Sequence, residues 1–392
     1  MVRRHDRLFA VIALMLMGVG CDSGPTYHQD IAPFVAASCL SCHDVDGASG
    51  LPLTTWPEVR AAAPAALAAL RSGRMPAGNI DRSGECATFT GPEPVHTEDI
   101  ESLARWVEAG SVEGAVVDPE SAVAPPPFSV GQHFEFGPFQ SDEGEHRCTL
   151  VEGDPDPSFL TALRVESSSP GAVHHMMLFT LQTTADVASA LTLDAADDAP
   201  GWACEGPTGV SGASLAAVWT PGSPVVTFPD GTGLALAGGA MIVQLHLGRA
   251  SVRTEATVTV DLTLATCVAH SLSLIPIAAT GLSLPPGKPV VHWTETLPLP
   301  APDLDVYGVF PHMHAMGSAL SLRSPDECLV QAPRWDYGWQ ELAFYEQPVS
   351  LASGVPLELA CQYSTLDTDE PTVWGESATD EMCMVFLLAG EG

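Results

Sequence analysis

The chain has 392 residues, enough for about three ordinary domains, and 46% of its residues are hydrophobic. The 48 acidic residues against 15 Lys and Arg give a formal net charge of -33, which excludes the basic surface that nucleic acid or anionic lipid would need. With 35 Gly and 34 Pro residues, the composition favours a globular protein with many short strands and turns.

The N-terminus has the pattern of an export signal. Three arginines precede an apolar run at residues 8–19, which is too short to span a bilayer as a helix. The run ends at a sequence that resembles a bacterial lipobox, Gly18-Val19-Gly20-Cys21, although Gly18 stands where Leu is usual. We expect residues 1–21 to be a lipoprotein-type signal peptide, with lipidated Cys21 holding an exported protein at a membrane surface of the bacterial cell envelope, periplasmic or outer. Ordinary cleavage, which would release a free periplasmic protein, is the alternative.

The first predicted domain covers residues 25–114 and is mainly helical. Residues 58–71 are rich in alanine and predict one helix. A second helix is expected to start at Thr97 as N-cap and to end at Gly110, with apolar residues at helical spacing between them.

A haem-attachment pattern lies in this domain, Cys39-Leu40-Ser41-Cys42-His43. A Cys-x-x-Cys-His run predicts covalent haem c, with Cys39 and Cys42 forming the thioether bonds and His43 as the proximal iron ligand. Met75 is the expected sixth ligand, since the segment resembles a small c-type cytochrome, and those proteins place an axial methionine before a proline turn. The alternatives are a chance pattern or a redox dithiol for the motif, and a packing role for Met75.

An acidic, Ser- and Ala-rich stretch with three consecutive prolines predicts a linker at residues 115–127. Beyond it, alternation of apolar and polar residues replaces helical periodicity, most clearly at residues 256–265. Repeated Gly and Pro turns separate such stretches. We therefore expect antiparallel β-sandwich (jelly-roll-like) domains at residues 128–272 and 273–392. The predicted fold class is thus multidomain, a small all-α cytochrome c-like domain followed by two β-sandwich copper domains.

Candidate metal ligands are spaced along both predicted sandwich domains: His174, His175, His246, His312, His314 and Met382. Copper prefers all-imidazole and mixed imidazole and thioether sets over the ligands of hard cations, with zinc as the alternative metal. Adjacent histidines can share a metal only from an irregular or bulged strand, whereas a His-x-His pair on a regular strand shares one face. A structural role in the core is the alternative for His246 and Met382, and three other methionines are competing thioethers: Met176, Met177 and Met316.

Four ordered blocks, residues 173–179, 244–248, 311–314 and 380–383, resemble the ligand blocks of the copper type II, ascorbate-dependent monooxygenases. That family includes peptidylglycine α-hydroxylating monooxygenase and dopamine β-monooxygenase. The resemblance implies that one copper, for electron transfer, is held by His174, His175 and His246. It implies that the other copper, where oxygen binds, is held by the catalytic residues His312, His314 and Met382.

The resemblance also implies a disulfide between Cys361 and Cys383, next to Met382. Of the ten cysteines, Cys21 is assigned to lipid and Cys39 and Cys42 to haem, which leaves seven. Because seven is odd, at least one thiol is expected outside a disulfide, and the pairing of five cysteines stays open: Cys86, Cys148, Cys204, Cys267 and Cys328.

Departures from the family concern the substrate. The peptide-amidating members hold a peptide carboxylate with an arginine and an asparagine at positions that are Phe310 and Met384 here, and a tyrosine of theirs is Phe386. The pocket implied by these substitutions is apolar, which argues against a peptidylglycine substrate and favours a small neutral or apolar one.

The expected function is therefore a copper-dependent monooxygenase that hydroxylates a C–H bond with O2. Its expected cofactors are two copper ions and one covalent haem c, with ascorbate or another one-electron donor as reductant. Its expected partners are the small-molecule substrate, O2, a periplasmic electron donor and the membrane surface reached through Cys21, and no nucleic acid. The alternatives are a non-catalytic copper-binding and electron-transfer lipoprotein, and a cytochrome whose sandwich docks a partner protein.

Overall fold

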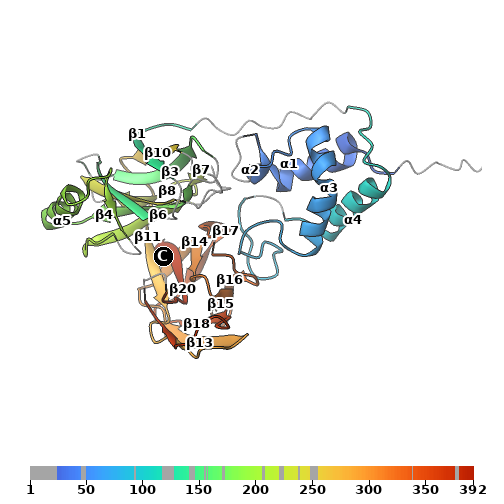
Figure 1. The fold of residues 1–392 in the computed structure, drawn as a ribbon. Coiled ribbons are helices and arrows are strands. Elements are labelled where there is room, and N and C mark those ends of the chain that lie inside the picture. Colours follow the sequence, from blue (N-terminus) through green and yellow to red (C-terminus); the bar gives the residue numbers. More distant parts are fainter. Residues whose placement is uncertain are drawn as a thin grey trace, which may run out of the picture.

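The structure, a computed structural model, describes residues 24–45, 50–91, 94–116, 128–140, 146–153, 156, 158–169, 173–204, 208–219, 225–236, 239–247, 255–337, 339–375 and 379–392. The expected signal peptide, its lipidation site at Cys21 and the prolines of the expected linker lie outside these residues. Figure 1 shows helices α1–α4 gathered at one end of the molecule and the strands packed at the other.

Short helices form the N-terminal part of the described chain. In chain order they are a π-helix at Tyr27–Ile31, α1 at Ala32–Ser38, α2 at Leu40–His43, α3 at Trp56–Arg71 and α4 at Thr97–Glu108. Their apolar sides meet around Ile31 and Trp106, both fully buried. The two predicted helices are confirmed, but His96 rather than Thr97 caps α4, since the His96 N–H donates to the Asp99 carboxylate at 2.9 Å. Within the described residues, no helix combines the length and hydropathy needed to cross a membrane.

Residues 74–90, called the docking segment below, run between α3 and α4 along the C-terminal β-structure. The Asn79 side-chain amide donates to the Trp339 carbonyl oxygen at 3.0 Å. A disulfide joins Cys86 to Cys328, which lies 242 residues further along the chain. The docking segment is therefore attached to the C-terminal strands by both a covalent bond and hydrogen bonds.

The predicted fold class is wrong. The described chain is mainly β-sandwich, its helices are short, from 4 to 16 residues, and no separate all-α cytochrome domain forms among the described residues. The physical reason is the docking segment, which interrupts the helices and packs on the β-structure: Phe89 forms a β-bridge with Tyr345, and their rings stack with centroids 5.0 Å apart. Periodicity identified individual helices, but it could not show what the chain between them packs against.

Two sheets form the sandwich nearer the N-terminus. One has the spatial order β1-β10-β3-β8, with β7 also paired to β3, and the other has the order β5-β2-β9-β4-β6. The bounds are β1 Gln132–Gln140, β2 His146–Glu152, β3 Ser158–Ser167, β4 Val173–Leu181, β5 Trp202–Ala203, β6 Ala213–Trp219, β7 Val225–Thr227, β8 Thr232–Leu236, β9 Ala240–Leu247 and β10 Glu255–Ala265, with helix α5 at Thr184–Ala195. The strand predicted at residues 256–265 is confirmed as β10, in which Val258, Val260 and Leu262 are fully buried.

The second sandwich pairs the sheet β11-β20-β14-β17 with the sheet β13-β18-β15-β16. The bounds are β11 His270–Ala278, β12 Ser283–Leu284, β13 Val291–Pro298, β14 Leu304–His312, β15 Gly317–Arg323, β16 Cys328–Ala332, β17 Ala343–Leu351, β18 Pro356–Tyr363, β19 Thr372–Val373 and β20 Met384–Glu391. β11 also pairs in parallel with β8, so one nine-stranded sheet runs through both sandwiches.

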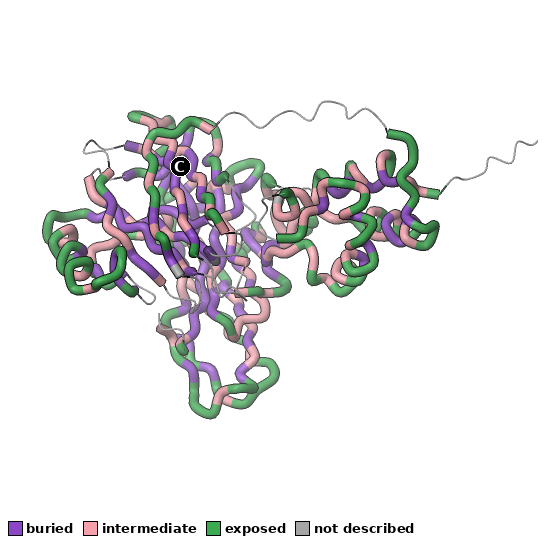
Figure 2. Tube along the Cα trace, turned by 45° about the horizontal axis from the view of Figure 1, so that its top comes forward, coloured by how far each residue is buried: buried purple, intermediate pink, exposed green. Residues whose placement is uncertain are grey.

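Buried residues concentrate along the strands of both sandwiches, as Figure 2 shows in purple. The core of the first sandwich contains Leu272, Phe344 and Leu388, which lie in β11, β17 and β20 of the second sandwich. The two sandwiches therefore share core residues as well as a sheet.

Removing the Cys86–Cys328 disulfide is expected to loosen the docking segment first. A disulfide typically contributes about 2–4 kcal/mol, so the double variant Cys86→Ala/Cys328→Ala should be cleaved in residues 74–90 by protease faster than the wild type. Mapping the first cleavage sites by mass spectrometry under native conditions measures this. Cys267→Ala is the matched control, because Cys267 is exposed and lies outside the three disulfides of the described residues. Equal cleavage rates for the double variant and the wild type would contradict the structural role of this bond.

Candidate metal centres and a cavity beside the helices

Three histidines from neighbouring strands meet in the first sandwich. His146 begins β2, His175 lies in β4, and His246 lies in β9, the strand between them. One ring nitrogen of each lies within 4.8 Å of those of the other two. The rings of His146 and His246 stack with centroids 4.0 Å apart, and the Nδ1 atoms of His175 and His246 are 3.3 Å apart. Three imidazoles so placed are a donor set suited to copper or zinc.

An irregular strand brings His175 to this group. A regular strand would place His174 and His175 on opposite faces. The pairing of β4 with β9 shifts register between Val173 and His175, so that Val173 lies opposite Leu247 while His175 lies opposite His246. The expected irregularity at the histidine pair is confirmed. Of the predicted ligands, the structure brings His175 and His246 together, and the side chain of His174 lies outside what the structure describes.

Sequence reasoning missed His146. Its place follows from the antiparallel pairing of β2 with β9, in which His146 lies directly opposite His246. A single histidine at the start of a strand carries no ligand signal, and only the register between two strands far apart in sequence reveals its neighbours.

A second pair of histidines lies at the end of β14. His312 is the last residue of that strand, and its Nδ1 donates to the Gln340 side-chain oxygen at 2.6 Å. The amide nitrogen of Gln340 donates to the Tyr337 carbonyl at 3.0 Å, which fixes the oxygen toward His312. The Nδ1 of His314 donates to the Asp380 carbonyl at 2.9 Å. Both rings therefore keep a lone pair on Nε2, the atom that a metal would bind.

The protonation state of His312 also favours a role as a metal ligand. Burial of the ring, together with the neighbouring His314, lowers the pKa of His312 to about 4, while the hydrogen bond to Gln340 opposes the shift. The imidazole is thus neutral near neutral pH, as metal binding requires.

A buried carboxylate ties Met382 to the histidine pair. Glu381 is completely buried and accepts hydrogen bonds from the N–H groups of His314 at 3.0 Å, Met316 at 2.7 Å and Met382 at 3.1 Å. Burial raises the pKa of Glu381, while these N–H donors oppose the shift. The Tyr363 hydroxyl also donates to the Met382 carbonyl at 2.8 Å.

The predicted disulfide between Cys361 and Cys383 is confirmed. It joins β18 to the residue after Met382, so the backbone at Met382 is fixed from both sides. The other two disulfides of the described residues are Cys86–Cys328 and Cys148–Cys204, and Cys267 takes part in neither.

Apolar side chains surround His312 on the same face of the sheet. Phe310 precedes it by two residues on β14, and Phe386 and Met384 lie opposite Phe310 and His312 on β20. The Phe310 ring centroid lies 6.0 Å from that of Phe386 and 6.1 Å from that of His312. Phe310 and Met384 are buried. The three departures noted in the sequence therefore form one apolar wall.

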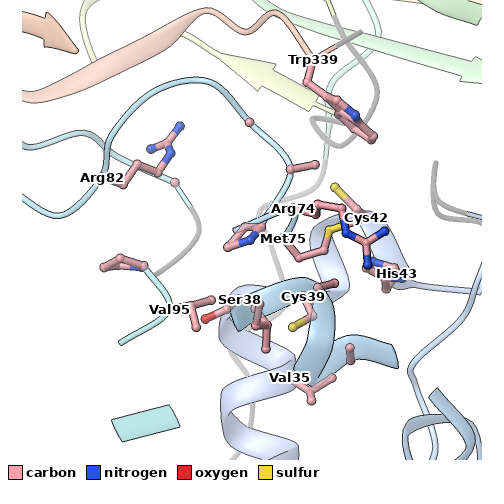
Figure 3. A pocket seen from close by; sticks show the side chains of 18 of the residues that line it. Val35, Ser38, Cys39, Cys42, His43, Arg74, Met75, Arg82, Val95 and Trp339 are labelled. Carbon is pink, nitrogen blue, oxygen red and sulfur yellow. The ribbon is translucent and has the colours of Figure 1, made fainter. Parts of the chain in front are cut away.

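A cavity of about 1470 Å³ lies between the helices and the β-structure (Figure 3). It exceeds the roughly 300–1,000 Å³ of most ligand pockets. Cys39, Cys42, His43 and Met75 line it, with Trp339 on the side of the β-structure. The predicted haem-binding residues thus lie around one cavity, which is shared with the sandwich rather than enclosed by helices.

Local bonds orient the Cys-x-x-Cys-His motif. The Nδ1 of His43 donates to the Leu51 carbonyl at 2.8 Å, which leaves its Nε2 as an acceptor. Cys39 and Cys42 are outside the disulfides of the described residues, and burial raises the pKa of the Cys39 thiol to about 11. The motif therefore places two cysteine side chains and an oriented imidazole at the cavity wall.

Comparison with known proteins finds a family to which the C-terminal part of the chain is similar. Residues 274–389 match the family described as the copper type II ascorbate-dependent monooxygenase, C-terminal domain. The segment includes β14, most of β20, His312, His314 and Met382.

Individual relatives agree with this family. The chain is 34% identical over 93 residues to putative DBH-like monooxygenase protein 2 of Homo sapiens, covering 22% of this chain and 19% of the relative. It is 24% identical over 239 residues to peptidyl-glycine alpha-amidating monooxygenase of Mus musculus, covering 56% of this chain and 22% of the relative. DBH-like monooxygenase protein 1 of Gallus gallus is 30% identical over 121 residues, covering 27% of this chain and 20% of the relative.

The chain is thus similar, over part of its length, to copper-dependent monooxygenases. The chain spans about a fifth of the length of the curated relatives it matches. The ligand roles of individual residues stay predictions.

Replacing Gln340 should weaken metal binding at the His312 site. Gln340→Leu removes the acceptor that orients the His312 ring, and loss of such a partner typically lowers metal affinity about 10–100-fold. A competition titration with a chromophoric Cu(I) chelator measures the change. Gln182→Leu is the control, because Gln182 is exposed and its amide donates to Thr180 at 3.2 Å in the other sandwich. An unchanged affinity in Gln340→Leu would refute the orienting role of Gln340.

Proposed function

We propose that this chain is a copper-dependent monooxygenase that uses O2 to hydroxylate a C–H bond of a small neutral or apolar molecule. The observation that carries the proposal is the His312 and His314 pair, whose Nδ1 atoms are both engaged, next to a Met382 backbone held by Glu381. This arrangement lies within the residues that match the monooxygenase C-terminal domain.

The donor sets fit copper. His312, His314 and Met382 offer two imidazoles and a thioether, a combination that suits Cu(I). His175 and His246, with the predicted His174, offer imidazoles alone. Bound copper would supply the one-electron chemistry with O2.

The protein's part in this chemistry is to hold the ligands before the metal arrives. Gln340 and the Asp380 carbonyl orient the two rings, and Glu381 joins the His314 and Met382 backbones. Ligands fixed in this way do not have to be ordered during binding, which favours affinity and a defined geometry.

The substrate class follows from the wall beside His312. Phe310, Met384 and Phe386 offer apolar contact and no group that could bind a carboxylate. Apolar surface of this kind favours a neutral or apolar molecule, because a charged group would lose its hydration there without a partner. This supports a substrate other than a peptide with a free carboxylate.

Hydroxylation needs two electrons from outside, since one oxygen atom enters the C–H bond and the other leaves as water after taking up two protons. In the proposal these electrons come from ascorbate or another one-electron donor, and a covalent haem c would supply the one-electron relay toward the copper sites. Cys39 and Cys42 would hold the haem by thioether bonds, and His43 and Met75 would ligate its iron.

The cavity fits such a group. It is lined by the two thiols and by His43, whose Nε2 is left as an acceptor, and three arginines also line it: Arg74, Arg82 and Arg334. The same lining contains three acidic residues, Glu58, Asp81 and Glu341, and Arg82 is paired with Glu341 at 3.1 Å, so the fit rests on the two cysteines and His43 rather than on charge. Trp339 lines the cavity and the next residue, Gln340, bonds to His312, so one short stretch of chain connects both places.

The proposal places the protein in the bacterial cell envelope, held at a membrane surface by lipidated Cys21, where a periplasmic donor reduces it. The pattern at residues 1–21 and the three disulfides support this, because disulfides persist in oxidising compartments.

Loss of a ligand from the proposed copper site at His312, His314 and Met382 should stop the reaction with oxygen. His314→Ala and Met382→Leu are each expected to reduce substrate-linked oxygen uptake at least about 100-fold, since losing a ligand costs no less than losing its orienting partner. An oxygen electrode measures uptake, and the haem absorption spectrum should stay unchanged. Met316→Leu, which removes a neighbouring thioether but keeps the N–H bonded to Glu381, is the control. Wild-type uptake in both variants would show that oxygen reacts elsewhere, and copper binding without uptake in the wild type would favour the non-catalytic alternative.

Covalent haem should depend on the two motif cysteines. The double variant Cys39→Ala/Cys42→Ala, made in cells that attach haem c, is expected to carry no covalent haem while binding copper as the wild type does. Denaturing gel electrophoresis with haem staining tests this, with Cys267→Ala as the control. A wild-type chain without covalent haem would refute the haem proposal and leave the copper chemistry untouched.

A further inference from the structure

His146 occupies a position that neither the sequence pattern nor the family resemblance assigns to a metal. Its ring nitrogen lies within 4.8 Å of those of His175 and His246, two of the expected ligands of the electron-transfer copper, called the first copper site below. Within the described residues, these three histidines are the set of at least three His, Cys, Asp or Glu side chains whose donor atoms lie close enough to share a metal ion.

The sheet presents the three rings on one face. β9 lies between β2 and β4, and His246 is directly opposite His146 on one side and His175 on the other. Residues directly opposite each other across antiparallel strands point to the same face. The register shift in β4 is what brings His175 into line, so the group depends on a local distortion rather than on regular alternation.

The strand that carries His146 is held firmly. The next residue, Arg147, is buried and donates to the Asp197 carboxylate at 2.9 Å and to the Gly201 carbonyl at 2.8 Å. Cys148, fully buried, forms the disulfide with Cys204. A ligand on a rigid strand keeps its geometry when the metal arrives, which is the condition for a defined site.

The alternative role for His146 is to pack against His246. Its ring lies nearly parallel to that of His246, with an interplanar angle of 11°. Packing alone, however, would be served by any aromatic ring, whereas the ring nitrogen of His146 also lies within reach of His175.

We propose that His146 is a further imidazole ligand of the first copper site, together with His175 and His246. The proposal rests on the proposed function for the identity of the metal. The site then draws ligands from three strands instead of two, and β2 becomes part of the metal centre.

The test is His146→Phe in the full chain, which keeps an aromatic ring against His246 but removes both nitrogens. Cu(II) affinity, measured by competition with a chelator, is expected to fall at least about tenfold, no less than for loss of a partner that only orients a ligand. Pulsed electron paramagnetic resonance of the bound Cu(II) should lose the coupling of one imidazole. Two variants bracket the result: His175→Phe should show the same kind of loss, and His292→Phe, at an exposed position on β13, should show none.

A measurement on the wild-type chain covers the case in which His146→Phe does not fold. Diethyl pyrocarbonate modifies accessible imidazoles, and His146 is half-buried, so mass spectrometry can follow its modification with and without copper. Protection of His146 by copper is expected, with His292 modified equally in both states.

The proposal would be overturned if His146→Phe kept the wild-type Cu(II) affinity and the same number of coupled imidazoles. It would also be overturned if copper did not slow the modification of His146 in the wild-type chain. None of these measurements requires turnover. The ligand role of His146 can therefore fail while oxygen uptake at the His312 site persists, and it can hold while uptake is absent.

Discussion

Attachment of the docking segment to the C-terminal sandwich is the constraint on which the rest of the structure depends. The Asn79 hydrogen bond and the Cys86–Cys328 disulfide hold this segment against the β-structure that also carries His312. Because α3 and α4 flank the segment, the helices are held beside the same surface, and the space between them and the strands becomes the cavity. The cavity and the position of His312 are thus properties of one assembled structure rather than of two modules joined by a linker.

Both groups of histidines lie where the regular ladder of a strand is interrupted. His175 follows a register shift in β4, and His314 comes just after β14 has ended at His312. Regular strands alternate their side chains between faces, so close donors on one chain need such an interruption or a partner strand. Beyond β14 the irregular backbone is stabilised by Glu381, which accepts hydrogen bonds from three N–H groups. These bonds offset the free-energy cost of burying its carboxylate.

Local patterns in the sequence predicted local structure well. Alternation identified β10, and the adjacent histidines indicated the irregular strand. The family resemblance implied Cys361–Cys383, which the structure contains. The sequence did not predict contacts between residues far apart in the chain. One is the packing of the docking segment on the C-terminal sandwich, which contradicts the predicted all-α domain, and the other is the strand register that brings His146 to His246. Periodicity reports which face of an element is apolar, but it does not say which other element covers that face.

Residues of the second sandwich complete the core of the first, and this affects the order of folding during synthesis. Leu388, close to the end of the described chain, is fully buried in the core of the first sandwich, and Leu272 joins the same core from β11, which pairs with β8. Multidomain chains generally fold from the N-terminus while translation continues. Here the first sandwich cannot complete its core until β20 has left the ribosomal tunnel, so its final packing follows synthesis of the second sandwich.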